Sequence, residues 1–387
     1  MIQNHGGTDE LSDAQSIPVV PTTQRETSTG ALPLRIAIVG CGTIAESAHL
    51  PAILASPEVQ LVGLVETSES RLRSLKQKFG LDIAGSPDHR ELFGKIDAVV
   101  LALPNFLHAP VGTEFLERGI PVLCEKPLSV RKAESVQLCS AAKTGRAVLA
   151  VGFVTRFFPS TLLTRRLLET EFLGKLSSFD YEFGTEGGWE TASGYNLSRE
   201  TSAGGVLAIS GSHFLDRMIF LFGEVEVVRF LDDSRGGVEA NCIAEFLAVY
   251  DGRHLPGTIT LSKTHRLANR LQIVGEKGVL IVAEGQRLSV TFHPARRDLR
   301  EEIFPASVIP GVPEQDYFRL QLEDFVRAIR ERTEPRVTGE QGLKSAALME
   351  ECYARAERLD EPWCDATIHH FRRALPAQQT VDPHKID

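Results

Sequence analysis

Three features are missing from this sequence: long apolar runs, paired cysteines and an excess of basic residues. No apolar run reaches the length of a membrane span, and the N-terminal residues are polar and acidic, unlike a signal peptide. The six cysteines are scattered and form no CxxC pair, so we expect reduced, packed thiols and neither a disulfide framework nor a bound metal. These absences predict a cytoplasmic protein that does not associate with membranes.

The net negative charge further limits the classes of binding partner that we expect. The chain carries 51 acidic and 42 basic residues, for a formal net charge of −9, and no basic patch stands out in it. Such a charge repels polyanions. We therefore expect a small-molecule ligand and no nucleic acid.

The sequence is long enough for two folded domains. With 387 residues, of which 42% are hydrophobic and 24% charged, it exceeds the roughly 150 residues of an average domain. Residues 1–33 are polar without an apolar period, and we expect either a flexible tail or an arm on another subunit. Residues 361–387 are expected to form a poorly ordered C-terminal extension.

Residues 34–151 alternate between apolar, strand-like runs and helical segments. The alternation predicts an α/β domain with a doubly wound parallel sheet, as in a Rossmann fold. The expected strands are residues 34–39, 60–65, 96–103, 121–124 and 148–151, and the expected helices are residues 43–55, 68–79 and 109–118.

Residues 152–360 show a different pattern, in which strands follow one another with few helices between them. It predicts an α+β domain with a large, open, mainly antiparallel sheet. Late amphipathic helices at 317–330 and 341–358 can pack back on the first domain. The open face of the sheet needs cover, which predicts a homodimer or homotetramer through it. The other expected elements are a helix at 161–168 and strands at 176–183, 224–230, 242–250, 257–262, 270–274, 278–282 and 287–292.

A glycine-rich turn joins the first expected strand to the first expected helix. Gly40 permits the tight turn, Gly42 lets the backbone approach phosphates, and Ala45 keeps the helix close to the sheet. Unpaired N–H groups at a helix N-terminus attract a pyrophosphate. The turn therefore predicts a site for NAD or NADP. Its residues, Gly40, Cys41, Gly42, Thr43, Ile44 and Ala45, match the GxGxxA variant of a dinucleotide-binding loop.

Glu66 ends the second expected strand, where the acid that binds the adenosine ribose belongs. Its carboxylate would accept hydrogen bonds from the ribose hydroxyls and repel a 2′-phosphate, which favours NAD. Arg71, one turn into the next helix, would accommodate that phosphate, so NADP stays possible. The alternative for Glu66 is a solvated charge at a strand end.

Polar residues also follow two later strands of this domain. The carboxyl ends of parallel strands form the edge where open α/β sheets bind ligands. A lysine beside a nicotinamide can hydrogen-bond a substrate hydroxyl and take or return its proton, so Lys126 is the expected catalytic residue. The residues at this edge are Pro104, Asn105 and His108 after one strand, and Glu125, Lys126 and Pro127 after the next.

In these motifs and their order, the sequence resembles the glucose-fructose oxidoreductase / inositol dehydrogenase / MocA (Gfo/Idh/MocA) family. The resemblance implies a first domain that binds NAD or NADP, and a second whose open sheet carries substrate contacts and subunit interfaces. Sugars, cyclitols or sugar nucleotides are the implied substrates. The resemblance spans roughly residues 34–359, through Val151-Gly152-Phe153, Arg156-Phe157, Gly204-Gly205, Gly211-Ser212-His213, Asp216 and the region of Phe325.

Carried onto matching positions, the resemblance assigns roles to particular residues. It implies Lys126 as the catalytic lysine and His213 as a second acid/base group or substrate ligand. It places Glu125 and residues 104–108 near the cofactor. The alternative for His213 is a packed, hydrogen-bonded histidine, and for His108 it is capping of a helix start.

The sequence departs from the family pattern close to His213. The family frequently has an aspartate where this chain has Ile209, whose side chain can neither hold a substrate hydroxyl nor support the lysine and histidine. Ser210 is adjacent, but neighbouring residues on a helix or strand point in different directions. Asp216 either orients the His213 imidazole or serves as a structural acid.

Further residues are candidates for contact with the substrate. Arg156 either anchors an anionic or hydroxylated substrate or makes a salt bridge between domains. Trp189 and Tyr195 lie in the glycine-rich residues 184–205, a candidate substrate loop whose aromatic rings would stack on a sugar. His49, in the first expected helix, is expected to be structural.

These observations lead to one main hypothesis and two others. The main one is an NAD(P)-dependent oxidoreductase that interconverts a secondary alcohol and a ketone on a sugar, cyclitol or sugar nucleotide. In it, Lys126 and His213 act in catalysis, while Arg156, Tyr195 and Ser210 contact the substrate together with His213. The second hypothesis is redox-neutral use of tightly held NAD in processing a glycoside. The third is a regulatory protein that binds a dinucleotide without catalysis, which Ile209 makes more plausible.

Overall fold

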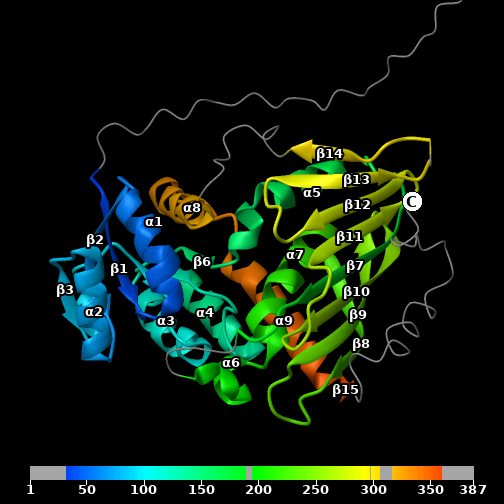
Figure 1. Cartoon of the computed structure of the whole chain (residues 1–387). Helices are drawn as coiled ribbons and strands as arrows, with labels where there is room; N and C mark the ends of the chain where they lie inside the picture. The colour runs from blue at the N-terminus through cyan, green and yellow to red at the C-terminus, as the bar shows by residue number, and fades with distance from the viewer. Residues whose placement is uncertain (1–31, 189–193, 297, 306–315, 360–387) are drawn as a thin grey trace, which may run out of the picture. The chain divides into compact units, whose positions relative to one another are not determined.

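The computed structural model describes residues 32–188, 194–296, 298–305 and 316–359 (Figure 1). The predicted N-terminal tail, apart from residues 32 and 33, and the C-terminal extension lie outside these residues, as do Trp189 and Cys364. The described part of the chain contains two β-sheets, one of six strands and one of nine.

The first sheet has the strand order β3-β2-β1-β4-β5-β6, and all its neighbouring strands are parallel. This order confirms the predicted Rossmann fold. Strands β4, β5 and β6 are buried at every residue, which is why they appear in the sequence as uninterrupted apolar runs. The strands are β1 (Leu34–Val39), β2 (Val59–Val65), β3 (Ala84–Ser86), β4 (Ala98–Leu101), β5 (Val122–Cys124) and β6 (Leu149–Val151).

Helices connect the parallel strands. The predicted helix at 43–55 is confirmed as one continuous helical segment, in which a π-helical turn at 45–49 precedes Pro51, a residue without a backbone N–H to donate. Helix α4 was not among the predicted helices, since its buried face consists of small residues apart from Leu138. The helical elements are η1 (Ala45–His49), α1 (Leu50–Ala55), α2 (Glu69–Phe79), η2 (His89–Leu92), η3 (Asn105–Leu107), α3 (His108–Leu116) and α4 (Lys132–Gly145).

The second sheet has the strand order β14-β13-β12-β11-β7-β10-β9-β8-β15. Its described strand pairs are antiparallel except for β7 with β10 and β8 with β15, which confirms a large, mainly antiparallel sheet. The strands are β7 (Leu176–Gly184), β8 (Glu224–Asp232), β9 (Asn241–Tyr250), β10 (Arg253–Ser262), β11 (Arg270–Gly275), β12 (Gly278–Ala283), β13 (Ser289–Pro294), β14 (Glu302–Pro305) and β15 (Ala356–Arg358).

Residues 356–358 correct one prediction, because they form strand β15 instead of the end of the last helix. They pair in parallel with β8, and Arg229 of that strand donates a hydrogen bond of 2.6 Å to Glu357. An edge strand such as β8 presents unpaired backbone groups. Pairing with that edge overrides the helical pattern of the sequence.

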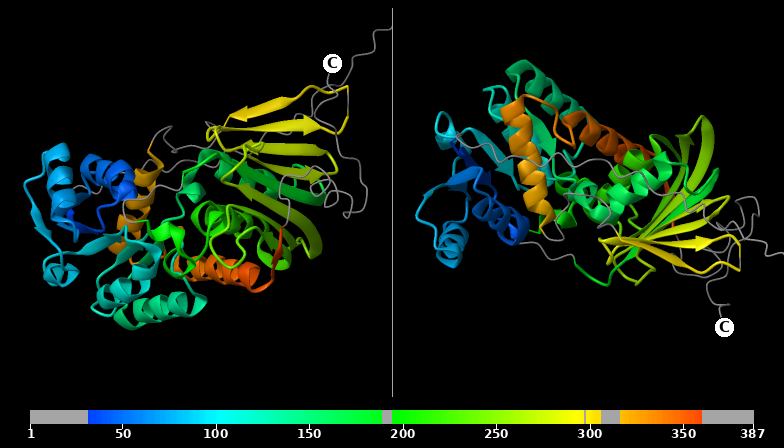
Figure 2. Two further views of the ribbon diagram at one scale, coloured as in Figure 1. Left: turned by 60° about the horizontal axis from the view of Figure 1, so that its bottom comes forward. Right: turned by 90° about the horizontal axis from the view of Figure 1, so that it is seen from above.

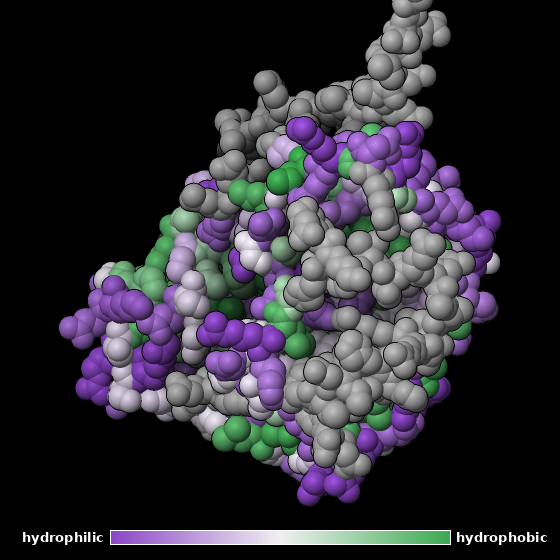
Figure 3. All heavy atoms as spheres, turned by 45° about the vertical axis from the view of Figure 1, so that its right-hand side comes forward, coloured by the Kyte–Doolittle hydropathy of each residue, from purple (hydrophilic) through white to green (hydrophobic). Residues whose placement is uncertain are grey.

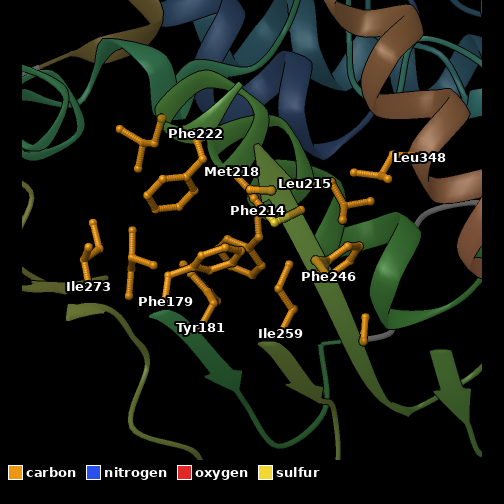
Figure 4. Packing of buried hydrophobic residues seen from close by; sticks show 14 of the residues in the cluster. Phe179, Tyr181, Phe214, Leu215, Met218, Phe222, Phe246, Ile259, Ile273 and Leu348 are labelled. Atoms are coloured by element: carbon orange, nitrogen blue, oxygen red, sulfur yellow. The ribbon is translucent and has the colours of Figure 1, made fainter. Parts of the chain in front are cut away.

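Helices cover one face of the nine-stranded sheet (Figure 2). On α7, Phe222 stacks on Phe179 of β7 at 4.6 Å between ring centroids, and Phe214 lies 3.9 Å from Tyr181 (Figure 4). The segment Arg199–Phe222 is long and apolar enough to cross a membrane, but 72% of its apolar window is buried, as in a core helix. The elements after β6 are η4 (Val154–Phe157), α5 (Pro159–Glu169), η5 (Tyr195–Leu197), α6 (Arg199–Ser202), η6 (Leu207–Gly211), α7 (Ser212–Phe222), α8 (Tyr317–Glu331) and α9 (Gly339–Ala354).

The opposite face of this sheet carries partly exposed side chains. Along β10, Ile259 and Leu261 are buried, while the alternate residues Thr258 and Thr260 are only half-buried. In Figure 3, hydrophobic side chains of the described residues appear in separate groups among hydrophilic ones. The alternation of buried and half-buried residues along β10 is typical of an antiparallel sheet with one covered and one open face.

The two late helices pack back on the first domain, as predicted. Leu322, Phe325 and Val326 of α8 belong to one core cluster with Ile36 and Ile38 of β1. Helix α9 lies against both sheets, since its glycines contact β6 while Leu348, Met349 and Cys352 belong to the core of the second sheet. The five cysteines in the described residues are free and buried, in agreement with the interpretation of packed thiols.

Candidate active site

The turn between β1 and η1 has the geometry of a phosphate-binding loop. Gly40 has a φ of +92°, and a Cβ atom there would lie 2.5 Å from the carbonyl oxygen of Ala102. Only glycine fits this close approach. A Cβ atom on Gly42 would meet no heavy atom within 4 Å, so open space lies beside the loop. Ala45, which is fully buried, begins the helical segment behind it.

Glu66 contacts this loop directly. Its Oε2 accepts a hydrogen bond of 3.1 Å from the N–H of Cys41, and its Oε1 accepts one of 2.9 Å from Ser68. The Arg71 guanidinium donates to the Cys41 carbonyl at 2.7 Å and also to Glu46. Glu66 therefore borders the loop where a ribose acid belongs, while Arg71 is already engaged by the loop and by Glu46.

The room beside Gly42, the helical segment behind it and the carboxylate at the end of β2 together fit a dinucleotide. Residues 40–45 would hold its pyrophosphate and Glu66 its adenosine ribose. Within the described residues, no group of three or more His, Cys, Asp or Glu side chains is placed to hold a metal ion.

Lys126 lies just after β5, at the carboxyl edge of the parallel sheet. Its Nζ donates a hydrogen bond of 2.6 Å to the backbone carbonyl of Ile209 in η6. Burial lowers the pKa of Lys126; Glu125 opposes this effect and Lys263 adds to it by repulsion between like charges. A lowered pKa makes the neutral amine, which is able to accept a proton, more accessible.

Glu125 is held by two donors. Its Oε1 lies 2.7 Å from Nε2 of His49, and its Oε2 accepts a hydrogen bond of 3.1 Å from the N–H of Lys126. Burial works against ionisation, but the His49 hydrogen bond and the nearby charges of His49 and Lys126 keep the pKa of Glu125 below its usual value. His49, expected to be structural, supports the residue that precedes the candidate catalytic lysine.

His213 stands in the first turn of α7, near Lys126. Its ring lies edge-on to Phe153, with 6.0 Å between centroids. Burial, together with the positive charges of Lys126, Arg217 and Arg287, puts the pKa of His213 well below its usual value, which favours a neutral imidazole. Its Nδ1 is buried and has no hydrogen-bond partner among the described residues.

Ile209 contacts Lys126 through its backbone and not through its side chain. The Ile209 side chain offers Lys126 no polar group, as expected, but the backbone carbonyl of Ile209 accepts the hydrogen bond from Lys126. Ser210 lies half-buried on the same π-helical turn. Tyr195 begins η5, and burial, together with the negative charge of Glu125, raises the pKa of its hydroxyl.

Arg156 and Asp216 form a buried ion pair with each other. The guanidinium donates two hydrogen bonds to the carboxylate, at 2.8 and 2.6 Å, and the two residues are 1% and 0% exposed. Asp216 therefore does not orient the His213 imidazole, and the Arg156 guanidinium is committed to a protein carboxylate. Asp216 is therefore a structural acid, and Arg156 makes a salt bridge; both were alternatives in the sequence analysis.

Two residues that follow β4 also have protein partners. The Asn105 side-chain amide donates a hydrogen bond of 2.8 Å to the carbonyl of Ser202 in α6 and so links the two domains. The fully buried His108 lies 3.0 Å from the Pro127 carbonyl and 2.9 Å from the Leu103 carbonyl. These contacts, and the position of Pro104 at the start of η3, hold residues 104–108 at the carboxyl edge of the parallel sheet.

The two parts of the chain each match a family model. Residues 34–153 match an oxidoreductase family with an NAD-binding Rossmann fold, and residues 165–359 match the C-terminal alpha/beta domain of that family. The chain belongs to the Gfo/Idh/MocA oxidoreductase family. The resemblance found in the motifs is confirmed, and this is a family of NAD(P)-dependent oxidoreductases.

Several curated proteins and solved structures are similar to this chain. Inositol 2-dehydrogenase of Rhizobium meliloti is 24% identical over 81% of this chain and 94% of its own length. The 3-ketoreductase KijD10 of Actinomadura kijaniata, solved with NADP and TDP-benzene, is 22% identical, with a TM-score of 0.74 over 84% of this chain and 99% of that chain. The WlbA dehydrogenase of Bordetella pertussis, solved with NADH and UDP-GlcNAcA, is 22% identical, with a TM-score of 0.71 over 87% of this chain and 96% of that chain.

The structure of this Gfo/Idh/MocA protein adds residues that motif reasoning missed. Lys263 follows β10 and repels Lys126, and Arg287 acts on His213 through its charge. Glu239 accepts hydrogen bonds of 2.8 Å from the N–H of Leu207 and from the Tyr353 hydroxyl, and thereby holds the start of η6. The sequence showed only that Lys263 follows one predicted strand and that Arg287 begins another.

Proposed function

We propose that this Gfo/Idh/MocA protein interconverts a secondary alcohol and the corresponding ketone on a sugar, cyclitol or sugar nucleotide, and that it uses NAD in preference to NADP. The observation that carries the proposal is the position of Lys126. Its amine is fixed by the Ile209 carbonyl at 2.6 Å, at the carboxyl edge of the Rossmann sheet and near the neutral imidazole of His213.

The chemistry divides between a cofactor and the protein. A bound nicotinamide dinucleotide supplies or accepts the hydride at the reacting carbon. In the direction of oxidation, the neutral Lys126 amine takes the proton of the substrate hydroxyl, and in reduction the ammonium returns it. The Ile209 carbonyl fixes the Nζ atom, so the amine is oriented before substrate binds. Glu125, anchored by His49, supports the protonated form through its charge.

His213 would bind the substrate beside this lysine. A neutral imidazole can donate one hydrogen bond and accept another, which suits a hydroxyl or a ketone oxygen. Its Nδ1 is buried without a partner among the described residues, and burial of an unsatisfied polar atom is costly. A hydroxyl of a polyol would satisfy it, and Ser210 and Tyr195 are further candidates for contact with the same molecule.

The preference for NAD rests on Glu66 and Arg71. The Glu66 carboxylate borders the phosphate loop, where a 2′-phosphate would be repelled. The Arg71 guanidinium, which would attract that phosphate, instead donates to the Cys41 carbonyl and to Glu46.

We further propose that the chain forms a homodimer or homotetramer through the open face of the nine-stranded sheet. Light scattering of the purified protein would measure the oligomeric state.

Substitution of Lys126 tests the proposed reaction. Sugars, inositols and sugar nucleotides are screened with NAD and NADP by the absorbance of the reduced nicotinamide. With the best substrate, Lys126→Ala is expected to lower kcat on the order of a hundredfold or more while NADH binding is retained. Lys95→Ala, which removes an exposed lysine of the same domain, is the control and should match the unmodified protein.

The same assay separates the other two hypotheses. Conversion of a glycoside without release of stoichiometric NADH would favour redox-neutral use of the cofactor. Cofactor binding without turnover on a broad panel would favour a regulatory dinucleotide-binding protein. Full activity of the Lys126→Ala protein would contradict the proposed mechanism.

A further inference from the structure

Lys263 is a buried lysine at the end of a strand that borders the active site. It extends the pairing of β10 with β9 by one residue, since its N–H donates to the Ala240 carbonyl at 2.8 Å. Lys263 is 9% exposed, which is unusual because lysine side chains are rarely buried without a partner. No hydrogen bond or ion pair of its ammonium group is formed with any residue that the structure describes.

A network of hydrogen bonds fixes the turn that carries this lysine. The Ser262 hydroxyl accepts hydrogen bonds from the N–H groups of Thr264 and His265, at 3.0 and 2.8 Å, and donates one to Asn241. The backbone carbonyl of Lys263 itself accepts a hydrogen bond of 2.9 Å from the N–H of Gly187. The position of Lys263 is therefore built by the protein, and an exposed, mobile lysine would not need these contacts.

Strand geometry places Lys263 on the active-site side of the sheet. Side chains two residues apart share a face, so Lys263 projects to the same side as Leu261, which packs against Gly211 just before His213. Its Nζ lies 3.2 Å from the position of a Cβ atom built on Gly188. Repulsion from Lys263 also lowers the pKa of Lys126, which agrees with this placement.

Within the part of the chain that the structure describes, positive charges around this point outnumber the free negative ones. Lys126, Lys263 and Arg287 are all positive, whereas the acid nearest to Lys126, Glu125, is held by His49 and by the backbone. The one carboxylate that the family frequently places here is replaced by Ile209. A largely buried lysine without a counter-charge among the described residues is costly, and a ligand anion would relieve that cost.

We propose that Lys263 binds an anionic group of the substrate, a carboxylate or a phosphoryl group carried by the sugar-like molecule. The polyol part of this substrate rests on the proposed function, while the anionic group rests on Lys263 alone. The protein would then favour sugar acids or phosphorylated sugars over the neutral sugars of the same stereochemistry.

Binding measurements test the proposal without requiring turnover. D-Glucose, D-glucuronate and D-glucose 6-phosphate, and the same three forms of D-galactose, are titrated by calorimetry into protein saturated with NADH. A hydrogen bond to a charged group contributes about 1.5–3 kcal/mol. The anionic form of at least one series is therefore expected to bind roughly tenfold to a hundredfold more tightly than the neutral form. The acid and phosphate arms show which anion is preferred.

Variants of the lysine assign that preference to a residue. Lys263→Met should remove it while NADH binding is retained, and Lys263→Arg should keep most of it because the charge remains. Lys277→Met, which removes an exposed lysine from the turn after β11, is the control and should behave as the unmodified protein. The retained NADH affinity and the Lys263→Arg protein distinguish loss of the charge from loss of the fold.

The outcomes are clear in either direction. Absence of any preference for an anionic form in the unmodified protein overturns the proposal, as does a preference that survives in Lys263→Met. Turnover is measured separately by NADH formation. Selective binding of an anionic sugar without its oxidation would refute the proposed reaction and support the role of Lys263. Oxidation of neutral and anionic sugars that bind with equal affinity would support the proposed reaction and refute the role of Lys263.

Discussion

The buried pair of Arg156 and Asp216 gives the sharpest prediction about stability. The two side chains are 2% and 0% exposed and are joined by two hydrogen bonds. In Asp216→Ala the guanidinium is left buried without its carboxylate, which costs about 3–5 kcal/mol in comparable cases. Unfolding entropy is about 2.1 cal/mol/K per residue, so for 387 residues the Tm should fall by roughly 4–6 °C.

A double-mutant cycle separates this effect from simple loss of packing. Replacing both partners by apolar residues, as in Arg156→Met with Asp216→Leu, removes the stranded charge and should recover most of the lost stability. Differential scanning calorimetry of the unmodified protein, Arg156→Met, Asp216→Leu and the double variant gives the coupling energy of the pair, and Asp216→Ala is measured beside them. A Tm for Asp216→Ala within about 1 °C of the unmodified protein, together with a large loss of kcat, would refute this reasoning and would restore Asp216 as the residue that orients His213.

Three further predictions concern the cofactor, the pH profile and the start of η6. Glu66→Ala should shift the ratio of kcat/KM for NADPH over NADH upward on the order of tenfold, because the charge that repels a 2′-phosphate is gone; an unchanged ratio would remove Glu66 from the ribose site. In alcohol oxidation, kcat/KM should rise with pH through a pKa of Lys126 that lies below 10.5. Lys263→Met should move that inflection to higher pH, since a repelling charge is removed; an inflection that stays or falls contradicts the assignment. Burial raises the pKa of Glu239 from 4.5 to about 7, so its contribution to stability is present below pH 4.5 and is lost as the pH rises to about 7. Urea unfolding at both ends of this range should show a change of about 3 kcal/mol in the difference between the unmodified protein and Glu239→Gln, and a constant difference would contradict it.

The cofactor half of the protein could be predicted closely from the sequence. Its information is local: a buried parallel strand is apolar throughout, a tight turn needs Gly40, and the strand that ends just before Glu66 puts that acid beside the loop. Such requirements depend on residues that are close in the chain. For the same reason the strand-end position of Lys126 could be read from the motif.

The substrate half depends on contacts that sequence patterns do not record. The support of Lys126 comes from a backbone carbonyl of Ile209, and any residue type offers that group. Arg156 and Asp216 appeared as separate candidates, and only the fold shows that they neutralise each other. Lys263 follows a strand that carries no motif, and its charge acts on Lys126 because the two domains pack together.

Helix α8 has a consequence for how the protein is made. Its residues Leu322, Phe325 and Val326 complete the core that surrounds β1, yet they are among the last to leave the ribosome. Domains commonly fold in order of synthesis, from the N-terminus. Here part of the apolar surface of the nascent nucleotide-binding sheet stays uncovered until nearly the whole second domain has been translated. We therefore expect a gene fragment that ends at β6 to yield an aggregation-prone product, although it encodes every residue of the phosphate loop.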